Sequence, residues 1–171
     1  WSRLVAKDFL HWLALPAQLD WLDVGCGTGA LTQTVLQQAN PRSVTGIDPS
    51  AGFVDYAKAH VSDAKVTFEV GDAQSLPVKS ARFDAAVSGL VLNFVPKPLL
   101  AAQEMTRAVR SGGTVAAYVW DYAGKMELMR YFWDAAVALD PEASKLVESL
   151  RFPICQPNAL VALWSEVELR D

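Results

Sequence analysis

The stretch that decides the fold is Leu22-Asp23-Val24-Gly25-Cys26-Gly27-Thr28-Gly29. A short apolar segment ends in three glycines at alternate positions, and a helical pattern of apolar residues begins directly afterwards. Glycines at such a place let the backbone turn sharply and approach a ligand without a Cβ in the way. The free N–H groups of the following helix point toward the same place. The stretch therefore predicts a strand, a ligand-binding loop and a helix.

The alternation of strand and helix continues outward from this loop. Strand patterns cover residues 21–24, 43–47, 65–70, 83–88 and 114–120, and helical patterns cover 30–39, 50–61 and 99–109. Ser50 is the expected N-cap of the second of these helices, and 111–113 (Ser-Gly-Gly) is the expected end of the third. This order predicts an α/β fold, a Rossmann-like doubly wound, mostly parallel sheet with helices on both faces.

The flanking segments are helical in pattern. One helix is expected over residues 5–13, and residues 126–136 and 160–167 each carry apolar residues at helical spacing. We expect a single domain over residues 1–171, with a helical insertion at about 122–155 whose Met and aromatic residues serve packing. The chain begins with Trp rather than Met, and we expect both ends to be truncated.

Composition limits the classes of function. Of the 171 residues, 51% are hydrophobic, which supplies a core for one domain, and the formal net charge is -4. Because no Lys/Arg cluster stands out, we expect no nucleic-acid partner. The longest apolar run is too short to span a membrane and no signal peptide is visible, so we expect no membrane association. The two cysteines indicate a reducing compartment, hence a cytoplasmic location. No metal-ligand spacing occurs.

Two further carboxylates follow predicted strands. Asp48 ends the second strand, where a carboxylate can accept both ribose hydroxyls of a nucleoside lying across the glycine loop. Asp72 ends the third strand, where it can accept the exocyclic amine of adenine while the N–H of Ala73 meets a ring nitrogen. Either residue alone has an ordinary explanation, a helix cap for the first and a solvated turn for the second. Three successive strand ends with an acid or a glycine turn favour a nucleoside site.

The motifs resemble those of class I S-adenosylmethionine-dependent methyltransferases, in particular the small-molecule, type 11-like branch. The likeness runs from about Leu4 to Trp120 in the family's motif order. The segments that carry it are 23–29 (Asp-Val-Gly-Cys-Gly-Thr-Gly), 46–50 (Gly-Ile-Asp-Pro-Ser), 71–74 (Gly-Asp-Ala-Gln), 83–88 with 92–94, and 107–113.

The resemblance implies an enzyme that binds S-adenosylmethionine and releases S-adenosylhomocysteine. It places the glycines beneath the methionine and ribose, with Asp23 at the loop and the aminoacyl end. It assigns the ribose to Asp48, the adenine face to Pro49, and the region of the methyl group to the end of the fourth strand. Arg3 is a further candidate, for the cofactor carboxylate, with a solvated helix residue as the alternative. The implied cofactor-binding residues are Arg3, Asp23, Gly25, Gly27, Gly29, Asp48, Pro49, Asp72, Ala73, Gln74, Ser88 and Gly89.

The chain departs from the family at its end. The family usually completes its sheet with an antiparallel β-hairpin, and this chain stops where the first of those strands is due, so we expect the hairpin to be missing.

Two other interpretations of the function stay open. A nicotinamide-dependent oxidoreductase is possible because Gly25-x-Gly27-x-x-Ala30 satisfies a relaxed dinucleotide fingerprint, although Asp23 and Asp72 argue against it. A non-catalytic binding module with the same fold is the third.

The expected reaction is in-line displacement at the sulfonium methyl, helped mainly by proximity and alignment. The expected partner is a small-molecule methyl acceptor, and the sequence identifies neither that acceptor, nor a general base, nor the oligomeric state. Tyr118, Asp121 and Asn93 lie near the expected acceptor side, but each has an ordinary structural explanation. His11 and His60 are interpreted as solvated or packing residues.

Overall fold

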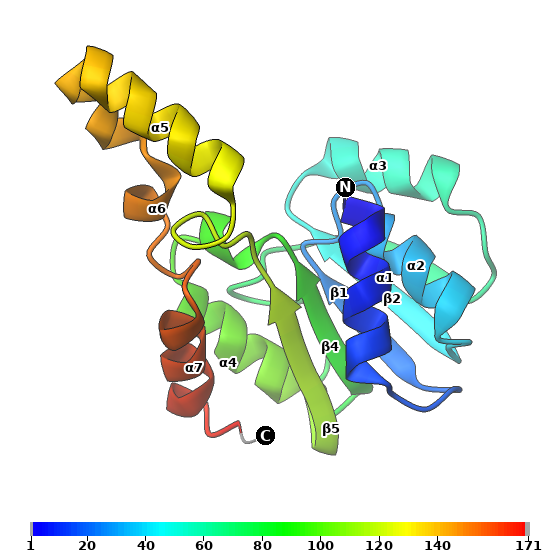
Figure 1. Cartoon of the computed structure of the whole chain (residues 1–171). Helices are drawn as coiled ribbons and strands as arrows, with labels where there is room; N and C mark the ends of the chain where they lie inside the picture. Colours follow the sequence, from blue (N-terminus) through cyan, green and yellow to red (C-terminus); the bar gives the residue numbers. More distant parts are fainter. Residues whose placement is uncertain (1, 170–171) are drawn as a thin grey trace.

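A parallel β-sheet forms the centre of the protein, for which the computed structural model describes residues 2–169. Its five strands lie in the order β3-β2-β1-β4-β5, and every neighbouring pair is parallel (Figure 1). The strands are β1 (Asp20–Val24), β2 (Ser43–Asp48), β3 (Val66–Val70), β4 (Phe83–Gly89) and β5 (Val109–Tyr118). This arrangement confirms the predicted α/β class.

The strand order reverses beside β1. The chain runs outward from β1 through β2 to β3, then returns to place β4 on the other side of β1. The loops that follow β1 and β4 therefore leave the sheet in different directions. Open α/β sheets bind ligands in the crevice that such a reversal opens at the carboxyl ends of the strands.

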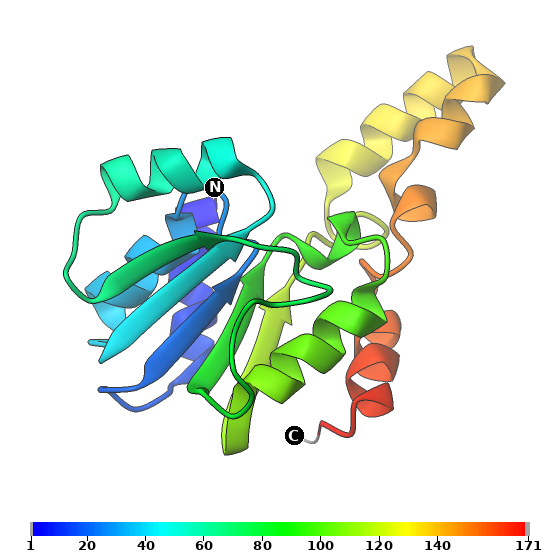
Figure 2. The same cartoon turned by 180° about the vertical axis from the view of Figure 1, so that it is seen from behind.

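Helices cover both faces of the sheet. On one face lie α1 (Ser2–Leu13), α2 (Ala30–Gln38) and α3 (Ala51–His60). On the other lies α4 (Pro98–Ala108), which Figure 2 shows in front of the strands, with α7 (Pro157–Glu166) packed beside it. Successive strand residues point to opposite faces, so Trp21 packs with α1 and α2 while Leu22 packs with α4 and α7. Burial on both faces explains why these strands are apolar throughout.

The end of α4 differs from the prediction. The helix stops at Ala108 and β5 begins at Val109, so the glycines of 111–113 lie inside the strand rather than at a helix terminus. The reason is tertiary: the N–H groups of Ala81 and Arg82 donate to the carbonyls of Arg107 and Ala108. Because a neighbouring loop satisfies the last carbonyls of the helix, no left-handed glycine is needed there.

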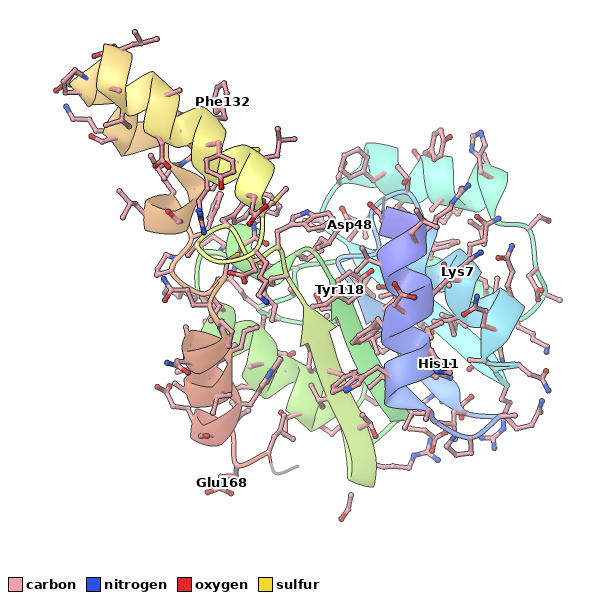
Figure 3. All side chains as sticks on the ribbon, viewed as in Figure 1. Lys7, His11, Asp48, Tyr118, Phe132 and Glu168 are labelled. Atoms are coloured by element: carbon pink, nitrogen blue, oxygen red, sulfur yellow. The ribbon has the colours of Figure 1, made fainter. Side chains whose placement is uncertain are left out.

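The segment after β5 forms a helical arm, defined as residues 127–151. It comprises α5 (Glu127–Leu139), a 3₁₀ turn η2 (Pro141–Leu146) and α6 (Glu148–Arg151), and it extends outward from the body in both views (Figures 1 and 2). No residue of α5 is buried, and Leu128 is 80% exposed. Phe132 points away from the rest of the chain (Figure 3). Within residues 2–169, no helix combines the length and apolar character needed to cross a bilayer.

Candidate functional site

A cavity of about 500 Å³ opens at the carboxyl edge of the sheet. It is lined from the loops that follow β1, β2, β3 and β4 and from the end of β5. Figure 3 shows Asp48 and Tyr118 at this same end of the molecule. Eight of the predicted cofactor residues line the cavity: Asp23, Gly25, Gly27, Asp48, Pro49, Asp72, Ala73 and Gly89.

The glycine loop forms the floor of the cavity. Gly25 has a φ of +75°, and a Cβ there would lie 2.4 Å from a methyl carbon of Val91, so only glycine allows these segments to approach. At Gly27, with a φ of +52°, a Cβ would meet nothing within 4 Å. The space above Gly27 is therefore open for a ligand that lies directly on the backbone.

Asp48 connects the glycine loop to the start of α3. One carboxylate oxygen accepts the N–H of Gly27 at 2.9 Å, and the other accepts the N–H of Ser50 at 2.9 Å. Ser50 in turn caps α3, as predicted, by accepting the N–H of Phe53. Asp48 is only 7% exposed and lines the cavity, so its carboxylate is oriented in advance toward any hydroxyl-bearing ligand.

Asp23 is a buried acid with an unused oxygen. Its Oδ2 accepts the hydroxyl of Thr32 at 2.6 Å, whereas its Oδ1 has no hydrogen-bond partner in the described part of the chain. Burial, opposed by the Thr32 hydrogen bond and reinforced by the charge of Asp48, raises the pKa of Asp23 from 3.8 to about 6. A buried, unpaired carboxylate oxygen beside a cavity is suited to a cationic ligand.

The loop after β3 is held in place by α4. Leu76 donates its N–H to Glu104 at 2.7 Å, and Arg107 donates to the carbonyls of Leu76 and Val78 at 3.1 and 2.9 Å. The same loop carries Asp72 and its neighbour Ala73 into the cavity wall. A salt bridge between Glu104 and Arg107 thus fixes a ligand-facing loop from outside the cavity.

Four predicted cofactor residues do not line the cavity. Arg3 is an exposed residue of α1. Gly29 is turned toward α3, where a Cβ would meet Val61 at 2.9 Å. Gln74 is partly buried beside the cavity loop and donates to the Asp72 carboxylate. Ser88 is fully buried and donates its hydroxyl to the carbonyl of Val24, which joins β4 to β1.

The second side of the cavity is apolar, and sequence reasoning did not identify most of it. It consists of Leu90, Val91, Phe94, Val95, Pro96 and Tyr118. Of the three residues that the sequence placed near the acceptor side, Tyr118 lines this wall, whereas Asp121 and Asn93 do not line the cavity. Phe94 is 65% exposed, an unusual state for a phenylalanine in a short turn, but exposure is not visible in a sequence.

The cavity lining holds acids but no strong base. The residues that line it include three aspartates and no Lys, Arg or His. Burial raises the pKa of the Cys26 thiol, with further increases from the charges of Asp23 and Asp48, so this cysteine stays neutral. Across residues 2–169, no group of three or more metal-ligating side chains comes together. The electrostatic field of the site therefore favours a cationic ligand over an anionic one.

Comparison with known proteins gives the site its context. A family model described as "Methyltransferase domain" matches residues 22–117. A rice (Oryza sativa) 2-methyl-6-phytyl-1,4-hydroquinone methyltransferase is 32% identical over 149 residues, which cover 86% of this chain and 42% of that protein. The chain spans about a third to a half of the length of the curated relatives it matches.

Solved structures share the fold. One described as a methyltransferase from an antibiotic biosynthesis pathway of Anabaena variabilis superposes with a TM-score of 0.75 at 21% identity, covering 98% of this chain and 61% of that one. The [4+2]-cyclase SpnF superposes with a TM-score of 0.60 at 29% identity, covering 66% of this chain and 43% of that one. The same architecture thus occurs in a protein named for a reaction other than methyl transfer.

Proposed function

Because this chain belongs to the methyltransferase domain family, we propose that its cavity binds S-adenosylmethionine and that the protein transfers the sulfonium methyl group to a small-molecule acceptor. The observation that carries the proposal is the combination of three aspartates and an open glycine loop in one cavity without a basic side chain. A cationic nucleoside fits this arrangement. A dinucleotide brings two negative phosphates, which three aspartates oppose.

The residues present fit the cofactor part by part. Asp48 would accept the ribose hydroxyls, since its carboxylate lies in the cavity and is already aligned by two backbone N–H groups. The unpaired Oδ1 of Asp23 would accept the ammonium group of the methionine portion. Asp72 and Ala73 would meet the adenine edge. When bound, the cofactor supplies an electrophilic methyl carbon.

The protein's own contribution to transfer is binding and alignment. The glycine loop and the aspartates would hold S-adenosylmethionine, and the apolar wall from Leu90 to Pro96 would exclude water from the reacting atoms. The name of the rice relative supports a small-molecule acceptor. SpnF shares this fold but is named a cyclase, so a demonstration of cofactor binding would not by itself show that methyl transfer takes place.

The decisive binding experiment is a calorimetric titration with S-adenosylmethionine, S-adenosylhomocysteine and NAD. The proposal expects saturable binding of the first two and none of NAD; the reverse result overturns it. Asp48→Asn should weaken S-adenosylhomocysteine binding by about 10- to 100-fold, because a hydroxyl loses a charged acceptor worth about 1.5–3 kcal/mol. Asparagine is preferable to alanine because one oxygen still accepts a loop N–H. Asp55→Asn, on the exposed surface of α3, is the matched control.

Transfer itself is measured with S-adenosylmethionine that carries a labelled methyl group. The protein is incubated with a panel of small-molecule acceptors, and label in the organic product is counted. The expected result is labelled product together with S-adenosylhomocysteine. Tight cofactor binding without transfer to any acceptor would instead favour the non-catalytic reading.

A further inference from the structure

The cavity is divided into two halves of opposite character. The cofactor half, as proposed above, is bounded by the glycine loop and the three aspartates. The other half is bounded by the turn after β4 and the end of β5, and its wall is made of the six residues Leu90, Val91, Phe94, Val95, Pro96 and Tyr118. None of these six side chains carries a charge at neutral pH. The acceptor half is therefore apolar, with a single hydroxyl.

Phe94 and Tyr118, the two aromatic residues of this wall, are held in place by rings from distant segments that lie behind them. Phe94 contacts Phe152 edge to face, with ring centroids 5.4 Å apart, and Tyr122 lies 6.0 Å from Phe152. Tyr118 packs against Phe9 of α1 at 4.7 Å. These residues come from the turn after β4, from β5, from the segments flanking the helical arm and from α1. Flat aromatic surfaces are best matched by a planar apolar ligand.

Tyr118 supplies the one polar group of the acceptor half. A Cβ at Gly89 would lie 2.5 Å from the Tyr118 hydroxyl, so the phenol sits directly over the end of β4. Burial, followed by the charge of Asp23, raises the pKa of Tyr118, so its hydroxyl keeps its proton. A protonated phenol donates a hydrogen bond and does not act as a base.

No other residue that lines the cavity provides a base on this side. The two histidines lie elsewhere, His11 on the outer surface of α1 (Figure 3) and His60 stacked on Tyr56 of α3. Asp23 belongs to the cofactor half, where its free Oδ1 is assigned to the ammonium group of the cofactor, and Cys26 is a neutral thiol. An acceptor that needs a protein base to become nucleophilic would react slowly here.

The geometry points to an acceptor that is an uncharged, planar, largely apolar ring bearing a hydroxyl group, such as a phenol or hydroquinone, whose oxygen accepts a hydrogen bond from Tyr118. This inference rests on the proposed function and identifies the substrate class of the same site. The acceptor's own hydroxyl proton leaves to water. The oxygen's electron pair then bonds to the methyl carbon while the carbon–sulfur bond breaks, and the electron pair of the broken bond stays on sulfur as a neutral thioether.

The test uses two probes of equal ring size and different charge, 2-naphthol and 2-naphthoate. Each is titrated calorimetrically into the protein saturated with S-adenosylhomocysteine at pH 7. We expect 2-naphthol to bind at least tenfold more tightly, because the cavity offers apolar walls and no cation for a carboxylate. Equal or tighter binding of 2-naphthoate would overturn the inference. Failure of S-adenosylhomocysteine to saturate the protein would instead overturn the proposed function.

Variants locate the binding. Phe94→Ala should reduce 2-naphthol affinity through loss of ring contact, and Tyr118→Phe should reduce it by about 3- to 10-fold, the range of one hydrogen bond. Both should bind S-adenosylhomocysteine like the wild type, which shows that the protein is folded. Leu128→Ala, an exposed apolar position on the helical arm, is the control and should leave 2-naphthol affinity unchanged. If only Leu128→Ala weakens binding, the probe occupies the arm and the inference fails.

A pH–rate measurement tests whether the acceptor loses its proton without help from a protein base. Across a series of substituted phenols, the midpoint of the pH–rate profile for methyl transfer should follow each phenol's own pKa. A midpoint that stays constant across the series would reveal a protein base and would contradict the inference.

Discussion

Replacing Asp23 by asparagine should change stability and cofactor affinity in opposite directions. Asn is nearly the same shape, and its amide oxygen can still accept the Thr32 hydroxyl, so the charge is the main difference. In the folded protein, burial raises the pKa of Asp23 from 3.8 to about 6. That rise corresponds to about 3 kcal/mol of destabilisation once the group is ionised, at about 1.4 kcal/mol for each tenfold change in proton affinity.

The sign of the pH dependence follows from the raised pKa. Below 3.8 the carboxyl is protonated in both states and has no effect on the free energy of unfolding. Between 3.8 and about 6 the folded state holds more protons than the unfolded state, so stability falls as pH rises. Above about 6 the full cost is present. An asparagine at this position does not titrate and avoids this loss.

The assay is urea unfolding of both proteins at pH 4, 5.5 and 7. The free energy of unfolding of Asp23→Asn, relative to wild type, should increase by about 2 kcal/mol from the lowest to the highest pH. An unpaired amide N–H₂ offsets part of the absolute gain but not its pH dependence. Parallel pH profiles for the two proteins would refute the reasoning, because they would mean that Asp23 is not a buried charge. Asp55→Asn controls for the loss of one exposed acid.

The same variant should bind S-adenosylmethionine at least about tenfold more weakly at pH 7, because the ligand's ammonium group loses a charged acceptor. Calorimetry measures this directly. A stabilised variant with unchanged affinity would place the aminoacyl end of the cofactor away from Asp23.

Two further changes test the architecture of the site. Gly29→Ala should destabilise the protein by about 2–3 kcal/mol, because its φ is +84° and the new Cβ would lie 2.9 Å from Val61. The new Cβ of Gly27→Ala meets open space, so this variant should lose only about 1 kcal/mol of stability through backbone strain, yet it should bind the cofactor more weakly. Urea unfolding of the two glycine variants measures the difference, and equal losses of unfolding free energy would contradict the argument. Arg107→Met should cost about 1–2 kcal/mol, since the side chain is one-third exposed, and should increase hydrogen exchange in the 76–80 loop. Unchanged exchange there would mean that Arg107 does not hold the loop.

Local sequence determined most of the cofactor half. A strand that must be buried on both faces is apolar throughout, and a backbone that must turn with positive φ requires glycine, so β1 and its loop could be predicted from neighbouring residues. Acids at the ends of parallel strands are brought to one edge by the topology alone. For these reasons Asp23, Asp48 and Asp72 were correctly expected to lie around one cavity.

Only the tertiary structure decided the rest. Gly29 and Ser88 belong to the same motifs as the cavity residues, yet one turns toward α3 and the other joins two strands, because a motif does not specify which way each side chain faces. The end of α4 depended on carbonyl partners from a loop far away in sequence. The apolar half unites Phe94 and Tyr118 from separate segments, with Phe152 packed against Phe94 from outside the cavity. Such contacts arise from packing between elements, which no local pattern in the sequence encodes.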